Sequence, residues 1–85
     1  MSRHDKILAR LLSRPNDFTF DELVTLLKHY GYSQCAAGAT GGSRVMFVDG
    51  QKNVIRLHKP HPRRILKLYQ IDDIVTALRE GGHIQ

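Results

Sequence analysis

The 85-residue sequence contains no tryptophan, only one cysteine and only three prolines. The single cysteine, Cys35, cannot form a disulfide within the chain, which favours a reducing compartment and excludes a disulfide-stapled scaffold. No apolar run approaches the roughly 20 residues needed to cross a bilayer, and residues 1–5 do not begin the long apolar stretch of a signal peptide. We therefore expect a cytoplasmic protein that does not enter a membrane.

The length restricts the chain to one domain. A sequence of 85 residues, 41% hydrophobic and 25% charged, has the composition of an ordinary folded domain with one modest core. There is no internal repeat, and no linker is long enough to divide the chain. A single domain over residues 1–85 is therefore expected, which excludes a two-domain enzyme, a large cofactor cradle and a long solenoid.

Positive charge is concentrated in the second half of the chain. Residues 1–42 carry five basic and four acidic residues, whereas residues 43–85 carry eight and four, so most of the net charge of +5 lies after residue 42. Such a footprint is typical of nucleic-acid binding, because each neutralised phosphate releases counterions. The alternative is a solvated loop of a basic protein. The uninterrupted basic stretch contains Lys52, Arg56, Lys59, Arg63, Arg64 and Lys67.

Two helices are expected near the N-terminus. Apolar residues at helical spacing predict a short amphipathic helix over about 4–13. Thr19 and Glu22, three positions apart, form a capping box in which each side chain satisfies a free backbone amide of the next helix. That helix runs to Tyr30, and Gly31 is its expected left-handed stop.

Three strands and a last helix follow. The pattern predicts a weak strand over 32–37 and better strands over 44–48 and 53–58, the latter two joined by a hairpin at 49–52. The order α-α-β-β-β-α predicts an α+β fold, a three-stranded antiparallel sheet with helices packed on one face. In the last helix, Asp72 and Asp73 are expected in the first turn and Gly81 at the end.

Alternation along the strands gives the sheet two different faces. The apolar alternate positions of the second and third strands should face the helices, which turns Arg44, Arg56 and His58 toward the open face. Two guanidinium groups and an imidazole on one exposed surface are suited to bind phosphate. The apolar positions are Val45, Phe47, Ile55 and Leu57.

The segment His58-Lys59-Pro60-His61-Pro62 is the most unusual string in the chain. The sequence offers no third metal ligand close to its two histidines, so neither a metal nor another cofactor is expected. An imidazole with a pKa near ~6.5 suits general acid–base catalysis at neutral pH. In RNA cleavage such a base takes the proton of the 2′-hydroxyl, and neighbouring arginines stabilise the charge that develops on phosphorus. The alternative is that the histidines only add charge to a basic edge, and this interpretation is favoured more for His61 than for His58.

The other residues of chemical interest are interpreted as structural. Gly41-Gly42-Ser43 leads into a strand and not into a helix, so we interpret it as a turn and not as a phosphate-binding loop. Cys35 is expected to be a small buried side chain. His4, His29 and His83 are expected at the surface.

Several short motifs occur in a defined order along the chain. Gly42-Ser43-Arg44 precedes an Asp-Gly hairpin, and His58-Lys59-Pro60-His61-Pro62 follows it. A helix then leads to Gly81-Gly82-His83-Ile84. Upstream, the capped helix from Phe20 to Tyr30 is followed by Gly31-Tyr32.

In content and order these motifs resemble the HicA family of bacterial toxins. The resemblance covers about residues 20–84, and residues 1–15 would be an additional N-terminal helix. It implies a fold similar to the double-stranded RNA-binding domain. It also implies a metal-independent ribonuclease that cleaves messenger RNA and is neutralised by a HicB antitoxin.

The chain departs from this family at one position. HicA toxins usually carry Gly-Ser-His near the start of the second strand, with that histidine as the catalytic residue, whereas Arg44 stands here. Arginine stays protonated and cannot act as an ordinary general base. Two hypotheses are therefore open: a toxin that binds and cleaves messenger RNA with His58 or His61 as acid or base, and a non-catalytic module that binds RNA or an antitoxin. The expected phosphate-binding residues are Arg44, Lys52, Arg56, Lys59, Arg63 and Arg64.

Overall fold

The structure, a computed structural model, describes residues 3–36, 44–60 and 63–85. It confirms the expected α+β class and the order α-α-β-β-β-α. The turn predicted at Gly41-Gly42-Ser43 and the candidate His61 lie outside the described residues. The elements are α1 (Arg3–Leu12), α2 (Phe20–His29), β1 (Ser33–Ala36), β2 (Arg44–Val48), β3 (Val54–His58) and α3 (Leu68–Glu80).

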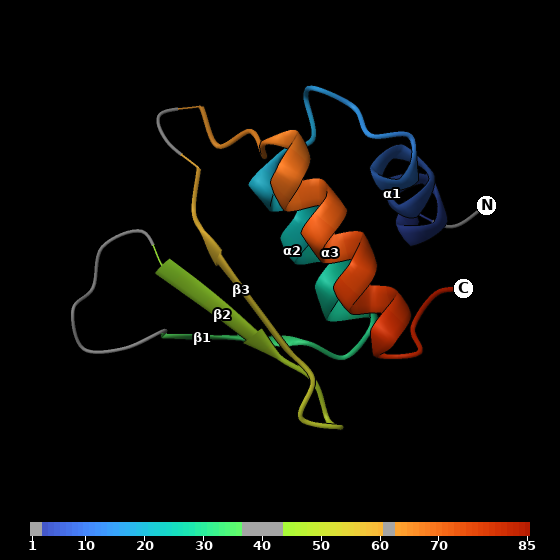
Figure 1. Ribbon diagram of the computed structural model, residues 1–85, viewed down its shortest axis with the longest axis vertical. Helices are drawn as coiled ribbons and strands as arrows, with labels where there is room; N and C mark the ends of the chain where they lie inside the picture. The colour runs from blue at the N-terminus through green and yellow to red at the C-terminus, as the bar shows by residue number, and fades with distance from the viewer. Residues whose placement is uncertain (1–2, 37–43, 61–62) are drawn as a thin grey trace.

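The elements form layers, with the sheet on the outside (Figure 1). The three strands are antiparallel in the order β1-β2-β3. Helices α2 and α3 lie over one face of the sheet, and α1 packs against both of them on the side remote from the sheet. The other face of the sheet is left without a covering element in the described part of the chain. The predicted packing of helices on one face is therefore confirmed.

The register of the sheet sets which side chains enter the core. Val45 lies opposite Leu57, and Phe47 lies opposite Ile55. Three of these four are buried and Leu57 is half-buried, as the alternation predicts. The ring of Phe47 lies near that of Phe20 from α2, with 6.3 Å between centroids, so the sheet and α2 share one hydrophobic core.

Helix α2 has the ends that the sequence predicts. The hydroxyl of Thr19 accepts a hydrogen bond from the Glu22 amide at 3.1 Å, and the Glu22 carboxylate accepts one from the Thr19 amide at 3.1 Å. After the C-cap residue Tyr30, Gly31 has a φ of +88°. Glycine adopts this left-handed conformation without the steric penalty of a Cβ, and the chain turns into β1.

The segment before α3 is held against the start of α2. The Phe20 amide donates to the Arg64 carbonyl at 2.8 Å, and the Leu66 amide donates to the Phe18 carbonyl at 2.8 Å. The two bonds flank an isolated antiparallel bridge. They fix the C-terminal end of the basic stretch beside the N-terminus of α2.

Helix α3 begins at an earlier residue than the sequence predicts. It starts at Leu68, so Asp72 and Asp73 lie in its second turn and not in its first. Its start is stabilised by Gln70, whose side-chain oxygen accepts a hydrogen bond from the Lys67 amide at 3.0 Å. The prediction failed because Lys67 has neither the hydroxyl nor the carboxylate that marks a typical N-cap.

Cys35 is exposed, and the prediction of a buried side chain was wrong. It lies opposite Met46 in the β1–β2 ladder, and directly opposite residues point to the same face. That face is the uncovered one, because the alternate β2 residues Val45 and Phe47 fill the core. Ala36 and Ala37, which follow Cys35 in the sequence, gave no alternation from which the orientation of β1 could be predicted.

The C-terminal end of the chain is tied to the β2–β3 hairpin. Asp49 is only 7% exposed, and its carboxylate accepts hydrogen bonds from the Gln51 amide and from both nitrogens of Asn53 at 2.8–2.9 Å. His83 Nε2 lies 2.8 Å from the same carboxylate. His83 is therefore half-buried, with 18% of its side chain exposed, and less accessible than the surface position expected from the sequence. Gly82, with a φ of +78°, lets the chain turn back toward the hairpin.

Candidate functional site

The uncovered sheet surface, here named the open face, carries the three residues that alternation assigned to it. Arg44 lies directly opposite His58 across β2 and β3, so their Cβ atoms are separated by roughly 5 Å. Arg56 precedes His58 by two residues on the same face, a step of roughly 7 Å along the strand. All three side chains are exposed. The other described members of the open face are Ser33, Cys35, Met46, Val48 and Val54.

The positive charge of this face is not neutralised by the described part of the protein. Within residues 3–36, 44–60 and 63–85, neither Arg44 nor Arg56 forms an ion pair. Other arginines of the chain do: Arg10 binds Glu22, and Arg14 binds Asp72, each at 2.8–2.9 Å. The guanidinium groups of the open face are therefore available to a ligand anion.

A hollow of about 340 Å³ lies among these residues. Its wall is formed by Arg44, Val45, Arg56, Leu57 and His58. A guanidinium presents several N–H groups in a planar fork that matches two oxygens of a phosphate. An imidazole can both accept and donate a proton near neutral pH. The hollow thus combines anion binding with a group capable of proton transfer.

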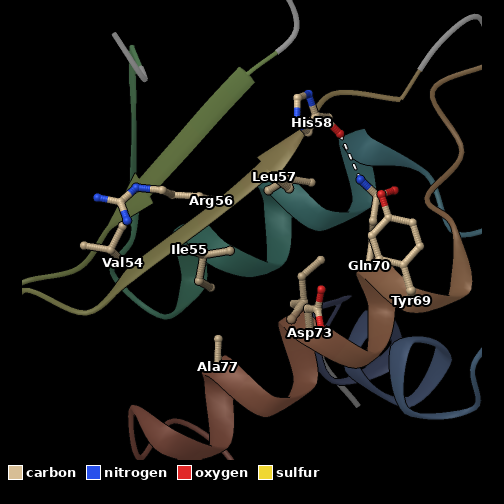
Figure 2. Close-up of a pocket in the computed structure, with 10 residues that line it drawn as sticks. Val54, Ile55, Arg56, Leu57, His58, Tyr69, Gln70, Asp73 and Ala77 are labelled. Carbon is tan, nitrogen blue, oxygen red and sulfur yellow. Dashed lines mark hydrogen bonds between the residues drawn. The ribbon is translucent and has the colours of Figure 1, made fainter.

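Gln70 fixes the backbone at His58. Its side chain is nearly inaccessible, with the residue 6% exposed, and its Nε2 donates to the His58 carbonyl at 3.0 Å (Figure 2). Because its Oε1 also accepts from Lys67, Gln70 joins the end of β3 to the start of α3. Figure 2 shows Arg56 directed away from α3 and Leu57 directed toward it. The sequence prediction missed Gln70, although its spacing of three from Lys67 is that of a capping-box glutamine.

The next basic residues lie over a buried ring at the start of α2. Lys59 Nζ is 5.5 Å from the centre of the Phe20 ring, and Arg64 Cζ is 5.6 Å from it. Arg64 also forms an ion pair of 2.7 Å with Asp21. Lys59 forms no ion pair with a described residue, so it is the freer of the two to contact an anion. Arg63 is exposed.

Lys52 is not brought to this site. It lies in the hairpin at the opposite end of β2 and β3, with a left-handed φ of +66°. Four strand steps separate that end from Arg44, which amounts to roughly 13 Å. Of the phosphate-binding residues expected from the sequence, Arg44 and Arg56 share the open face with His58. Lys59 and Arg64 both lie over the Phe20 ring at the start of α2.

Two further findings concern the described residues as a whole. No three His, Cys, Asp or Glu side chains gather among them in the manner of metal ligands. None of their helices is long and apolar enough to span a membrane.

A scan against models of protein families, a search of curated proteins and a search of solved structures each find no match for this chain.

Proposed function

We propose that the protein binds RNA through the open face and cleaves it as a metal-independent endoribonuclease of the HicA toxin type. The observation that carries the proposal is the position of Arg44, Arg56 and His58 on one exposed face, with no described carboxylate paired to either arginine. Phosphodiesters are the anions that such a constellation binds in nucleic-acid recognition.

In this proposal the arginines bind and the histidine transfers a proton. Arg44 and Arg56 hold the two non-bridging oxygens of one phosphate and stabilise the negative charge that grows there. His58 takes the proton of the adjacent 2′-hydroxyl, and the 2′ oxygen attacks phosphorus. The bond from phosphorus to the 5′ oxygen breaks, and that oxygen leaves with a proton from an acid, for which His61 is the candidate from the sequence. The products are a 2′,3′-cyclic phosphate and a 5′-hydroxyl.

The proposal assigns messenger RNA as the substrate and the cytoplasm as the location. It also assigns a HicB-like antitoxin as the protein partner. A partner that covers the open face would inhibit the protein by excluding RNA from Arg44, Arg56 and His58.

A second candidate function is a non-catalytic module that binds RNA or an antitoxin. The observation that favours it is Arg44, which stands where HicA toxins usually carry their catalytic histidine. This candidate predicts salt-sensitive RNA binding without turnover. It also predicts that Arg44→His gains cleavage, because the substitution would restore a titratable group opposite His58.

The two candidates are distinguished by incubating a labelled RNA with the protein in EDTA and resolving the products on a gel. The variants are His58→Ala and, as a matched control, His29→Ala, which removes an exposed histidine from α2 in the helical layer. We expect discrete cleavage products from the native protein and from His29→Ala. In His58→Ala the cleavage rate should fall at least a hundredfold, while the affinity for RNA is retained.

Undiminished cleavage by His58→Ala would eliminate His58 as the proton-transfer group. If the native protein shifts RNA on a native gel but leaves it intact, the second candidate is correct.

A further inference from the structure

A second hollow adjoins the open face where β3, the segment after it and α3 meet. It has a volume of about 250 Å³ and is named here the Tyr69 hollow. Its wall combines cationic, apolar and aromatic groups, and no acidic side chain lines it among the described residues. The lining residues are His58, Lys59, Pro60, Ile65, Lys67, Tyr69 and Gln70.

Tyr69 differs from the other tyrosines of the chain. It is 58% exposed in the first turn of α3, whereas Tyr32 is buried and Tyr30 is half-buried, each with its ring within 5.5 Å of that of His83. Within the described residues Tyr69 contacts no other ring and forms no side-chain hydrogen bond. The ring is thus presented to solvent with its faces available to a planar ligand.

The position of Tyr69 relative to the proposed phosphate site is fixed. Tyr69 and His58 line both the Tyr69 hollow and a neighbouring hollow between β3 and α3, where Figure 2 shows the tyrosine on α3 near the end of β3. The following residue, Gln70, is hydrogen-bonded to the His58 carbonyl at 3.0 Å. The aromatic ring is therefore held on a helix whose start is tied directly to the residue proposed to transfer the proton.

We propose that the Tyr69 hollow binds an unpaired base of single-stranded RNA, with Tyr69 as the stacking surface. Lys59 and Lys67 attract the phosphates that flank this base. The inference rests on the proposed function and specifies its substrate, because a base can stack on a protein ring only when it is free of its own helical neighbours. A duplex reaches the arginines of the open face but does not use Tyr69.

The first test compares the binding of a labelled single-stranded RNA and of a duplex of the same sequence by fluorescence anisotropy. Tyr69→Ala should weaken single-strand binding by about tenfold, the usual effect of losing one stacking contact, and should leave duplex binding unchanged. Tyr69→Phe keeps the ring and should bind as the native protein does. Leu68→Ala is the matched control, because Leu68 is a neighbouring exposed residue, 42% accessible, that does not line the hollow.

The second test uses the absence of tryptophan from the chain. In Tyr69→Trp the introduced indole is the sole tryptophan reporter, and single-stranded RNA should quench its fluorescence by stacking. Inorganic polyphosphate, which offers phosphates without bases, should bind without this quenching. Equal quenching by both ligands would overturn the inference.

The outcomes separate this inference from the function on which it rests. If Tyr69→Ala binds single-stranded RNA as tightly as the native protein, and RNA does not quench Tyr69→Trp, the base-binding hollow is wrong while RNA binding stands. If the native protein binds neither the single-stranded RNA nor the duplex, both the inference and the proposed function are overturned.

Discussion

At the residue scale, Asp49 shows how neighbours decide the state of a buried charge. Burial opposes ionisation of its carboxyl, but hydrogen bonds from Asn53 and His83 outweigh that effect and lower its pKa to about 2. The ionised group satisfies the hairpin amides and holds the C-terminal end of the chain. The protein therefore uses one buried carboxylate to join two segments that are 34 positions apart.

This lowered pKa predicts a loss of stability in acid. A carboxyl whose pKa is lower in the folded state stabilises the fold above its unfolded pKa of about 3.8, and that contribution is lost as the pH falls through about 2. The urea midpoint of the native protein should therefore exceed that of Asp49→Asn at pH 7, and the difference should shrink between pH 4 and pH 2. A difference that stays constant over this range would contradict the assigned role of Asp49.

The residues of the candidate site were predictable from the sequence to different degrees. Arg44, Arg56 and His58 could be assigned to one face because their strand neighbours are apolar at every second position, and the register bears this out. Tyr69 and Gln70 were not assigned, because the prediction placed Asp72 and Asp73 in the first turn of a helix that begins at Leu68. The contacts that link Gln70 to β3 depend on tertiary packing and leave no pattern in the sequence.

At the scale of elements, the starts and stops with strong local chemistry were the easiest to predict. The capping box of α2 and the glycine after it are present where the sequence places them. The start of α3 was not predicted correctly, because its cap is the side chain of Gln70, which accepts a hydrogen bond from the Lys67 amide. Strand β1 was predicted only weakly, because it is short and lacks an apolar alternation, and its pairing with β2 defines it.

The cap of α2 gives a prediction at this scale. Thr19→Ala removes the hydroxyl that accepts from the Glu22 amide and should destabilise the protein by about 1 kcal/mol. For a domain of this size the midpoint of thermal unfolding should fall by about 4–8 °C, as measured by circular dichroism.

Thr25→Ala is the matched control within the same helix. The Thr25 hydroxyl donates to the Asp21 carbonyl one turn earlier, and alanine has the higher helix propensity. Its unfolding midpoint should therefore stay within about 2 °C of the native value or rise slightly. An equal fall of the unfolding midpoint in both variants would show that the Thr19 cap makes no specific contribution to stability.

At the scale of the whole molecule, the layered arrangement determines which surface remains for a ligand. The helices cover one face of the sheet, and α1 covers the helices in turn, so the open face carries the basic residues of β2 and β3 without a described partner (Figure 1). The strands and the segment after them also contain most of the excess positive charge of the chain. The fold therefore separates the core, which lies between the helices and one face of the sheet, from the open face, whose charge suits an anionic partner.

The open face is proposed as the surface that contacts RNA. The most direct test is a titration of the isotope-labelled protein with a short single-stranded RNA, followed by nuclear magnetic resonance of the backbone amides. We expect the largest signal shifts at Arg44, Met46, Arg56 and His58, and little change along α1 on the remote side of the molecule. Shifts confined to the helical layer, or no shift at saturating RNA, would show that the open face is not the RNA-binding surface.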